Sequence, residues 1–221
     1  VLRANMVFSD VGVTELNGLD GKVSIPGASA GATGYWVAEN GAITESDQTF
    51  IARSLDGKTV GAMTDISMNL MKQSSIDVEA FVRNDIAMTL ASQIELKGLV
   101  GDGSSNTPTG VISTSGVGTE TLATADTPLQ IDVVNMWKSL ASNNALRGNL
   151  NWVGASTTLA NMMATPRTAT YGDIMILDPN ISPMRLMSYP VYATENAVAG
   201  STNKLILGDW SSLVMGSWGN G

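Results

Sequence analysis

The feature that most limits how this chain can fold is a long amphipathic segment, residues 74–99. Its apolar side chains recur about every four residues, as on one face of a helix, at Val82, Ile86, Leu90 and Ile94, with Phe81 and Leu96 beside them. A helix of about 25 residues is roughly 37 Å long, which is long for a chain of 221 residues. We therefore expect an elongated region built around a rod-like helix.

Both ends of this segment carry capping signals. Ser74 or Ser75 can cap the N-terminus, because a serine hydroxyl accepts a hydrogen bond from a free backbone N–H of the first turn. Gly98 can end the helix, because glycine adopts the left-handed conformation common at that position. We place the helix at 75–98.

The absence of two residue types removes much catalytic and metal-binding chemistry. The chain contains no Cys and no His. Disulfides, Cys/His zinc sites, Cys nucleophiles and the Ser-His-Asp triad are therefore impossible. We predict no catalytic residue, no cofactor and no bound metal.

Charge and hydropathy argue against two further classes. Charged residues make up 14% of the chain and the net charge is −8, whereas proteins that bind DNA through its phosphates need many Lys and Arg. Apolar runs such as residues 174–177 are far shorter than the ~18 residues of a membrane span. We expect a weakly charged globular protein, rich in strands and turns, with no membrane segment.

The first third of the sequence is typical of a long β-hairpin. A strand at Lys22–Pro26 should stop at its proline, and a flexible Gly/Ala/Ser stretch follows at Gly27–Gly34. Asn40-Gly41 is a tight-turn signal. Partial alternation then predicts extended runs at Thr49–Ala52 and Thr59–Met68.

The remainder predicts a compact α/β region at about 120–200. A helix at 128–143 should face inward with four apolar residues, Ile131, Val134, Trp137 and Leu140. Ser156 should cap a short helix that ends near Met163. The expected strands are Leu150–Val153, Ile174–Leu177, Met184–Ala193 with a break at Pro190, Asn203–Leu207 and Ser212–Met215. The fold class is therefore α+β.

Two motifs could bind small ligands, but a simpler interpretation is favoured for each. Ala52–Thr59 resembles a loose phosphate-binding loop with Lys58 as its cation, yet Thr59 opens a β-type run where that loop needs a helix. Asp102, Ser104 and Asn106 have the alternate spacing of a calcium loop, but the pattern lacks the final Glu ligand. We favour a hairpin bend and a polar turn.

Two groups of side chains are candidates for contacts between molecules. Glu39, Glu45 and Asp47 cluster near the expected hairpin turn, where a solvated acidic tip or a salt bridge to another subunit is favoured over acid–base chemistry. Three tryptophans could be either interface anchors or partly buried packing residues, namely Trp36, Trp210 and Trp218.

Five stretches of the sequence, taken in order, carry a resemblance that none of them carries alone. They are Trp36–Phe50, Gln73–Glu79, Gly101–Val111, Leu150–Leu159 and Tyr189–Trp210. Together they resemble the major capsid proteins of tailed phages, which have the Hong Kong 97-type fold. The resemblance implies a long extended β-hairpin, a peripheral domain with a long spine helix, and an axial α/β domain.

The resemblance also implies a division of the chain. The expected parts are the start of the peripheral domain at 1–17, the extended loop at 18–70, the peripheral domain at 71–120, the axial domain at 121–200 and a return to the peripheral domain at 201–221. Family members extend beyond both ends of this sequence, so we expect it to be truncated at the N- and C-termini and the last part to be incomplete.

The implied function is structural. The chain would be a subunit of an icosahedral phage or prophage head, assembled in the bacterial cytoplasm into pentamers and hexamers that enclose double-stranded DNA. Scaffold, portal or decoration proteins are possible further partners. We expect the residues that contact neighbouring subunits to include Trp36, Glu39, Glu45, Asp47, Glu79 and Arg83.

Some relatives cross-link neighbouring subunits through a lysine on the extended loop. This sequence has no Lys between Lys22 and Lys58, so we predict no such isopeptide bond. Three alternatives remain at this point: an encapsulin-type nanocompartment shell, a nucleotide-binding enzyme that uses Lys58, and a secreted β-rich adhesin. The capped long helix argues against the adhesin.

Overall fold

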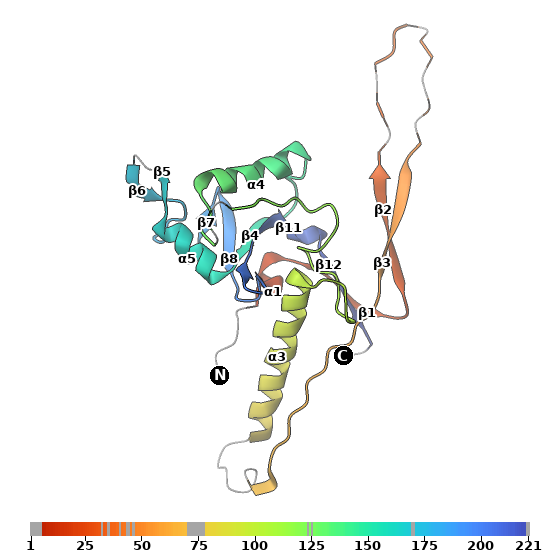
Figure 1. Ribbon diagram of the computed structural model, residues 1–221. Helices are drawn as coiled ribbons and strands as arrows, with labels where there is room; N and C mark the ends of the chain where they lie inside the picture. Colours follow the sequence, from red (N-terminus) through yellow and green to blue (C-terminus); the bar gives the residue numbers. More distant parts are fainter. Residues whose placement is uncertain are drawn as a thin grey trace. The chain divides into compact units, whose positions relative to one another are not determined.

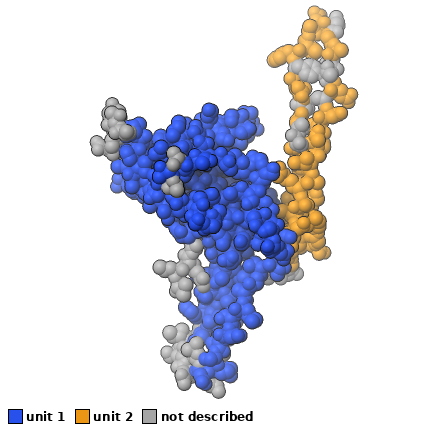
Figure 2. Space-filling view, in the orientation of Figure 1, with its two compact units in different colours: residues 1–14, 58–214 blue, residues 15–57, 215–221 orange. Residues whose placement is uncertain are grey.

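The computed structural model describes most of the chain, namely residues 6–31, 33, 34, 36–39, 41, 42, 45, 47–69, 78–122, 124, 126–168 and 171–219. The chain divides into two compact units (Figure 2). Unit 1 combines residues 1–14 with 58–214, and unit 2 combines 15–57 with 215–221. Helices and strands are both abundant, as the expected α+β class requires.

Figure 1 labels the elements along the chain. The helices are α1 (Phe8–Val11), α3 (Val78–Val100), α4 (Gln130–Ser142), α5 (Ser156–Ala164) and the short 3₁₀ turn η1 (Trp210–Ser212). The strands are β1 (Thr14–Leu19), β2 (Val23–Ala30), β3 (Thr49–Leu55), β4 (Leu150–Gly154), β5 (Pro166–Thr168), β6 (Tyr171–Met175), β7 (Arg185–Leu186), β8 (Tyr189–Ala193), β9 (Val198–Ala199), β10 (Thr202–Asn203), β11 (Leu205–Asp209) and β12 (Val214–Trp218). Within the described residues, no helix has the length and apolar character that a membrane span requires.

Unit 1 is organised around a four-stranded sheet with the order β11-β4-β8-β7. Strand β4 is antiparallel to β11 and parallel to β8, with Trp152 opposite both Leu207 and Val191. All five residues of β4 are buried, because the strand is central in the sheet and helices cover it. The strand expected at Leu150–Val153 is confirmed.

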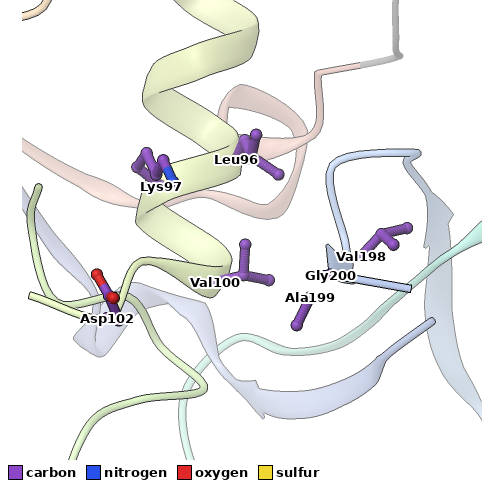
Figure 3. Close-up of a pocket in the computed structure, with 7 residues that line it drawn as sticks. All are labelled: Leu96, Lys97, Val100, Asp102, Val198, Ala199 and Gly200. Carbon is purple, nitrogen blue, oxygen red and sulfur yellow. The ribbon is translucent and has the colours of Figure 1, made fainter. Parts of the chain in front are cut away.

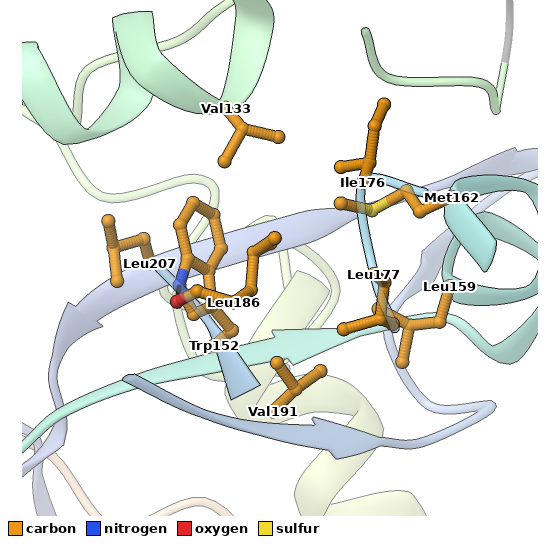
Figure 4. Packing of buried hydrophobic residues seen from close by; sticks show 9 residues of the cluster. All are labelled: Val133, Trp152, Leu159, Met162, Ile176, Leu177, Leu186, Val191 and Leu207. Carbon is orange, nitrogen blue, oxygen red and sulfur yellow. Dashed lines mark hydrogen bonds between the residues drawn. The ribbon is translucent and has the colours of Figure 1, made fainter. Parts of the chain in front are cut away.

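The main core lies between this sheet and the helices α4 and α5 (Figure 4). Nine buried residues form it: Val133, Trp152, Leu159, Met162, Ile176, Leu177, Leu186, Val191 and Leu207. The Trp152 indole is fully buried and donates its N–H to the carbonyl of Leu186 over 3.0 Å. The single polar atom of this large side chain is therefore satisfied inside the core.

The helix expected at 128–143 is confirmed, but its inward face is rotated. Ile131 is 58% exposed, and Val133 is buried in its place, so the prediction for Ile131 was wrong. Val133 is spaced i, i+4, i+7 with Trp137 and Leu140 and so shares their face, which Ile131 does not. Trp137 and Leu140 pack against the core as expected.

The long helix is confirmed from Val78 onward; its expected caps Ser74 and Ser75 lie outside the described residues. It continues past Gly98 to Val100, so the predicted end was wrong. Gly98 has a packing role instead: a Cβ there would lie 2.7 Å from the Phe8 ring. The chain leaves the helix at Gly101, whose N–H still bonds to the carbonyl of Lys97 over 2.9 Å.

The buried face of α3 also differs from the expected apolar stripe. Its fully buried residues are Glu95 and Leu99. Ile94 is 43% exposed and Phe81 62% exposed, which contradicts their predicted inward positions. Full burial is confined to the C-terminal turns, whereas Val82, Ile86 and Leu90 of the expected stripe are half-buried.

Unit 2 contains the hairpin of β2 and β3, which pair in antiparallel register from Val23 opposite Leu55 to Ala30 opposite Thr49. Strand β2 does not stop at Pro26, contrary to the prediction. A two-stranded ribbon has a free edge on each strand, where a proline costs no ladder bond. The run expected at Thr59–Met68 also forms no strand: residues 58–67 are irregular and belong to unit 1.

Two smaller predictions were also corrected. Ser156 is the first residue of α5, and the N-cap position is Ala155, without a side-chain hydrogen bond. The break in the Met184–Ala193 run falls at Met187 and Ser188, which have positive φ angles of 50° and 72°. This tight turn joins β7 to β8, and Pro190 lies inside β8.

Candidate inter-subunit surfaces

The residues expected to contact other subunits fall in two places. Four lie in the segment that joins β2 to β3, which we call the tip segment (residues 36–47). Trp36 is 102% exposed and Val37 47% exposed. An indole bears a large apolar surface, and a soluble protein seldom leaves one fully in water without a use for it.

The acidic side chains of the tip segment share this exposure. Glu39, Glu45 and Asp47 are all exposed, and within the described part of the chain none of them forms an ion pair. Because these carboxylates are exposed to water, their surroundings do not favour acid–base catalysis. A partner surface that complements this segment would have an apolar pocket for the ring and cations for the carboxylates.

The hairpin next to the tip segment is apolar on exposed faces as well. Phe50 is 68% exposed and Ile51 40% exposed, both on β3. Large apolar residues grouped on one exposed ribbon make it a candidate contact surface.

The base of the hairpin, in contrast, is fastened within unit 2. The Trp218 indole donates to the carbonyl of Gly21 over 2.6 Å and lies where a Cβ on Gly57 would be 3.1 Å away. Lys22 and Asp56 form an ion pair of 3.1 Å. Trp218 therefore packs inside its own unit.

The third tryptophan, Trp210, is also a packing residue. It is 3% exposed, its indole N–H bonds to the carbonyl of Asn151 over 2.9 Å, and its ring lies 6.5 Å from that of Phe8. Of the three candidate anchors, only Trp36 is free on the surface.

The second place is the exposed part of α3. Glu79 and Arg83 bond to each other over 2.6 Å with side chains that are mostly exposed. Such a pair contributes about 0.3–0.5 kcal/mol to a helix. Phe81 and Met88 on the same helix are 62% and 51% exposed, but their spacing places them on the face opposite Glu79 and Arg83.

A shallow groove lies at the other end of α3 (Figure 3). Its lining residues come from the helix, the loop after it and the β9–β10 hairpin: Leu96, Lys97, Val100, Asp102, Val198, Ala199 and Gly200. The cation of Lys97 and the anion of Asp102 thus lie beside apolar side chains.

Asp102 is the first residue of the spacing that resembles a calcium loop. Hydrogen bonds from the Ser104 side chain and N–H and from the Thr107 hydroxyl lower the pKa of Asp102 to about 2. The polar turn is confirmed, since the carboxylate oxygens are occupied within the loop. Among the described residues, no three acidic side chains gather as metal ligands.

The phosphate-binding interpretation of Ala52–Thr59 was wrong. The first four of these residues belong to β3, and Lys58 begins an irregular stretch. A phosphate loop needs a helix whose N-terminal N–H groups hold the anion, and residues 58–67 form none.

Sequence reasoning missed a buried acidic residue that joins distant segments. Glu95 is 2% exposed and accepts four hydrogen bonds from other segments of unit 1. A signal was present: Glu95 is four residues before Leu99, on the helix face that is buried. A charged residue in that register indicates a partner from elsewhere in the chain.

The chain is similar in sequence to known phage proteins. The sequence matches the Phage capsid family over residues 1–220. Over 117 residues it is 32% identical to the major capsid protein of Halomonas phage phiHAP-1. The aligned residues make up 53% of this chain and 19% of the relative. The chain is 24% identical over 162 residues to the major capsid protein of Klebsiella oxytoca phage phiKO2, covering 73% of this chain and 38% of the relative. The chain thus spans well under half the length of these curated relatives.

Solved structures share the fold. The capsid of a native GTA particle, computed with C5 symmetry, matches with a TM-score of 0.75 and 21% identity, covering 96% of this chain and 75% of the other. A chain from Microbacterium phage Oxtober96 matches with a TM-score of 0.74 and 13% identity, covering 100% and 75%. Together with the match over nearly all of its sequence, this fold places the chain in the phage capsid family.

Proposed function

We propose that the chain is a structural subunit of an icosahedral phage or prophage head, which assembles into pentamers and hexamers around double-stranded DNA. The family match over residues 1–220 carries the proposal. The fully exposed Trp36 supports it with a physical reason, because this residue gains most by being covered in an assembly. Such a subunit acts by packing against its neighbours, so we propose no catalytic role.

We propose the following roles for the parts of the chain. The β2–β3 hairpin is the extended loop, expected at 18–70, and α3 is the spine helix of the peripheral domain at 71–120. The sheet with α4 and α5 belongs to the axial domain at 121–200. Residues 1–17 and 201–221 belong to the peripheral domain, although 15–17 and 215–221 cluster with the hairpin. The hairpin belongs to a compact unit of its own, which supports its proposed role as the part that contacts a neighbouring subunit.

The tip segment would supply the contact with a neighbouring subunit. Burying an indole the size of Trp36 removes about 150–250 Å² of surface from water. Glu39, Glu45 and Asp47 would then face cations of the neighbour, and Arg83 is an exposed cation on α3. The contact joins different surfaces of identical subunits, and such head-to-tail contacts close into rings when the rotation permits.

The relation to packaged DNA is one of enclosure. The net charge of −8 leaves no excess of Lys and Arg to neutralise phosphates. We infer that DNA is contained without sequence-specific contacts.

The test is the mass of the purified chain by light scattering after size-exclusion chromatography, with electron microscopy of each peak. Pentamers, hexamers or closed shells would support the proposal. A dimer that buries Trp36 symmetrically would contradict it, because two-fold pairing uses the same surface twice and leaves nothing for ring closure.

A second test concerns covalent linkage. Between Lys22 and Lys58 the hairpin has no lysine to attack a neighbour's side chain. Assembled shells should therefore run as a single monomer band on a denaturing gel. A ladder of covalent multimers would show that a lysine outside this hairpin performs the reaction.

A further inference from the structure

A single buried carboxylate joins three segments of unit 1. The Oε2 atom of Glu95, on α3, accepts the backbone N–H groups of Val7 over 2.6 Å and Phe8 over 3.3 Å. Its Oε1 atom accepts the Thr194 hydroxyl over 2.9 Å and the Asn196 amide over 3.1 Å. One oxygen therefore serves the N-terminal segment, and the other serves the turn after β8. We call these five residues the Glu95 clamp.

Water cannot replace these bonds, because all five residues are almost fully covered. Glu95 is 2% exposed, Val7 0%, Phe8 8%, Thr194 1% and Asn196 4%. A buried carboxylate is costly unless its oxygens are hydrogen-bonded. If one segment withdraws, its oxygen loses both of its donors, and the orientation that serves the other segment is no longer held from both sides.

The turn side of the clamp leads to the groove of Figure 3. Asn196 is followed by Ala197, whose carbonyl accepts the Lys204 N–H over 2.9 Å at the base of the β9–β10 hairpin. Val198–Gly200 in that hairpin line the groove. The turn is therefore continuous with one wall of the groove.

We propose that the Glu95 clamp couples docking of the N-terminal segment to the conformation of the turn at residues 194–196 and of the β9–β10 hairpin. Undocking of Val7 and Phe8 loosens the turn and alters the groove, and loosening of the turn weakens the docking of Val7 and Phe8. This is a conformational coupling between two segments of unit 1 that meet at Glu95. It does not depend on the proposed shell function, because it is a property of the folded subunit.

The N-terminal segment has a second attachment that keeps this coupling local. The Val11 carbonyl, at the other end of α1, accepts the side-chain amides of Asn149 over 2.6 Å and Asn151 over 3.3 Å. α1 can therefore stay attached to the sheet when the clamp opens. Loss of the clamp is then measurable without unfolding of the unit.

The experiment is hydrogen exchange of the whole chain, with substitutions on one side of the clamp and the readout on the other. In Thr194→Val with Asn196→Ala, both donors to Oε1 are lost, and we expect the amides of Val7 and Phe8 to exchange roughly tenfold faster. Thr158→Val is the matched control. Thr158 is also 1% exposed, but within the described chain its hydroxyl has no hydrogen-bond partner, so exchange at Val7 should not change.

Two further variants sharpen the test. In Glu95→Gln only one side-chain oxygen remains, so at least one of the two segments loses its acceptor. The rate of hydrogen exchange should then rise at residues 7–8 and at 194–203. Ser92→Ala removes only the Ser92 hydroxyl, which donates to Asn196 Oδ1 over 3.1 Å. This mild variant should fold, and we expect about a threefold rise at Val7.

Two results would overturn the inference. In the first, the Thr194/Asn196 variant and Ser92→Ala speed exchange at 194–203 but leave Val7 and Phe8 unchanged, which would mean that the two oxygens act independently. In the second, exchange rises equally at β4, which would mean that the substitutions destabilise the unit as a whole.

Discussion

In the sheet core of unit 1, Trp152 is fully buried, and its one polar atom is bonded to the Leu186 carbonyl. In the tip segment of unit 2, Trp36 is wholly exposed. The same residue type is thus packed in the core in one region and exposed to water in the other. The difference teaches that apolar residues of this chain meet separate requirements: the buried ring stabilises the fold, and the exposed ring is free for the association that we propose.

The largest effect should come from the core. Trp152→Ala removes the ring at the centre of the cluster and leaves the Leu186 carbonyl without its donor. We expect a loss of about 3–5 kcal/mol in the free energy of unfolding, measured by urea denaturation. A loss below about 1 kcal/mol would mean that the core collapses into the space left by the ring. The core would then be less tightly packed than the complete burial of β4 indicates.

A glycine comparison should give the next largest difference. A Cβ at Gly110, in unit 1, would lie 2.5 Å from the backbone nitrogen of Gly101, whereas a Cβ at Gly31, in unit 2, meets nothing within 4 Å. Gly110→Ala should cost about 1–3 kcal/mol, because backbone atoms would have to move. Gly31→Ala should be neutral or stabilise by up to about 1 kcal/mol through the unfolded state. Equal effects in urea titrations would refute the contrast between the regions.

A smaller effect should appear in acid at the loop after α3. The folded-state pKa of Asp102 is about 2, below the ordinary 3.8, so its stabilisation is present above pH 3.8 and is lost as the pH falls toward 2. The urea midpoints of the wild type and Asp102→Asn should differ at neutral pH and converge in that acid range. Thr107→Val, which removes one donor to the carboxylate, should give a smaller difference with the same pH dependence.

A second carboxylate should add to this acid sensitivity. Burial raises the pKa of Asp209, but hydrogen bonds from Ser211, from the Asn149 N–H and from Ser212 outweigh it, so the pKa is lowered. Its stabilisation likewise disappears as the pH falls through the folded-state pKa. Both residues belong to unit 1, so acid should act on the core region before it affects the hairpin, which can be followed by hydrogen exchange.

The smallest effect on stability should accompany the largest effect on association. Trp36→Ala should change the free energy of unfolding of the isolated chain by no more than about 0.5 kcal/mol, because an exposed ring has little packing to lose. The yield of assembled particles in electron micrographs should fall sharply. Unfolding of the isolated variant would place Trp36 in a core and remove the distinction between the two regions.

Elements with a repeating pattern could be predicted from the sequence. The helix at Val78–Val100, the helix at Gln130–Ser142 and the strand from Leu150 were expected because their apolar spacing is regular over many residues. The exposure of the acidic tip was also expected from its glycine-rich surroundings.

Other elements depend on partners far away in the chain. α1 has four residues and no side-chain cap, so no periodicity could reveal it. Its first N–H groups are satisfied by Glu95, 87 and 88 positions later. The alternating run at Thr59–Met68 has the pattern of a strand but gained no pairing partner, and pairing is what makes a strand.

By itself, therefore, the sequence determined the element types where periodicity is strong, and it excluded disulfides and Cys or His chemistry. Only the tertiary structure decided which tryptophans are buried, where the long helix ends and what Glu95 binds. The physical reason is that spacing along the chain reports which side chains share a face, whereas burial and hydrogen bonding depend on which segments meet that face.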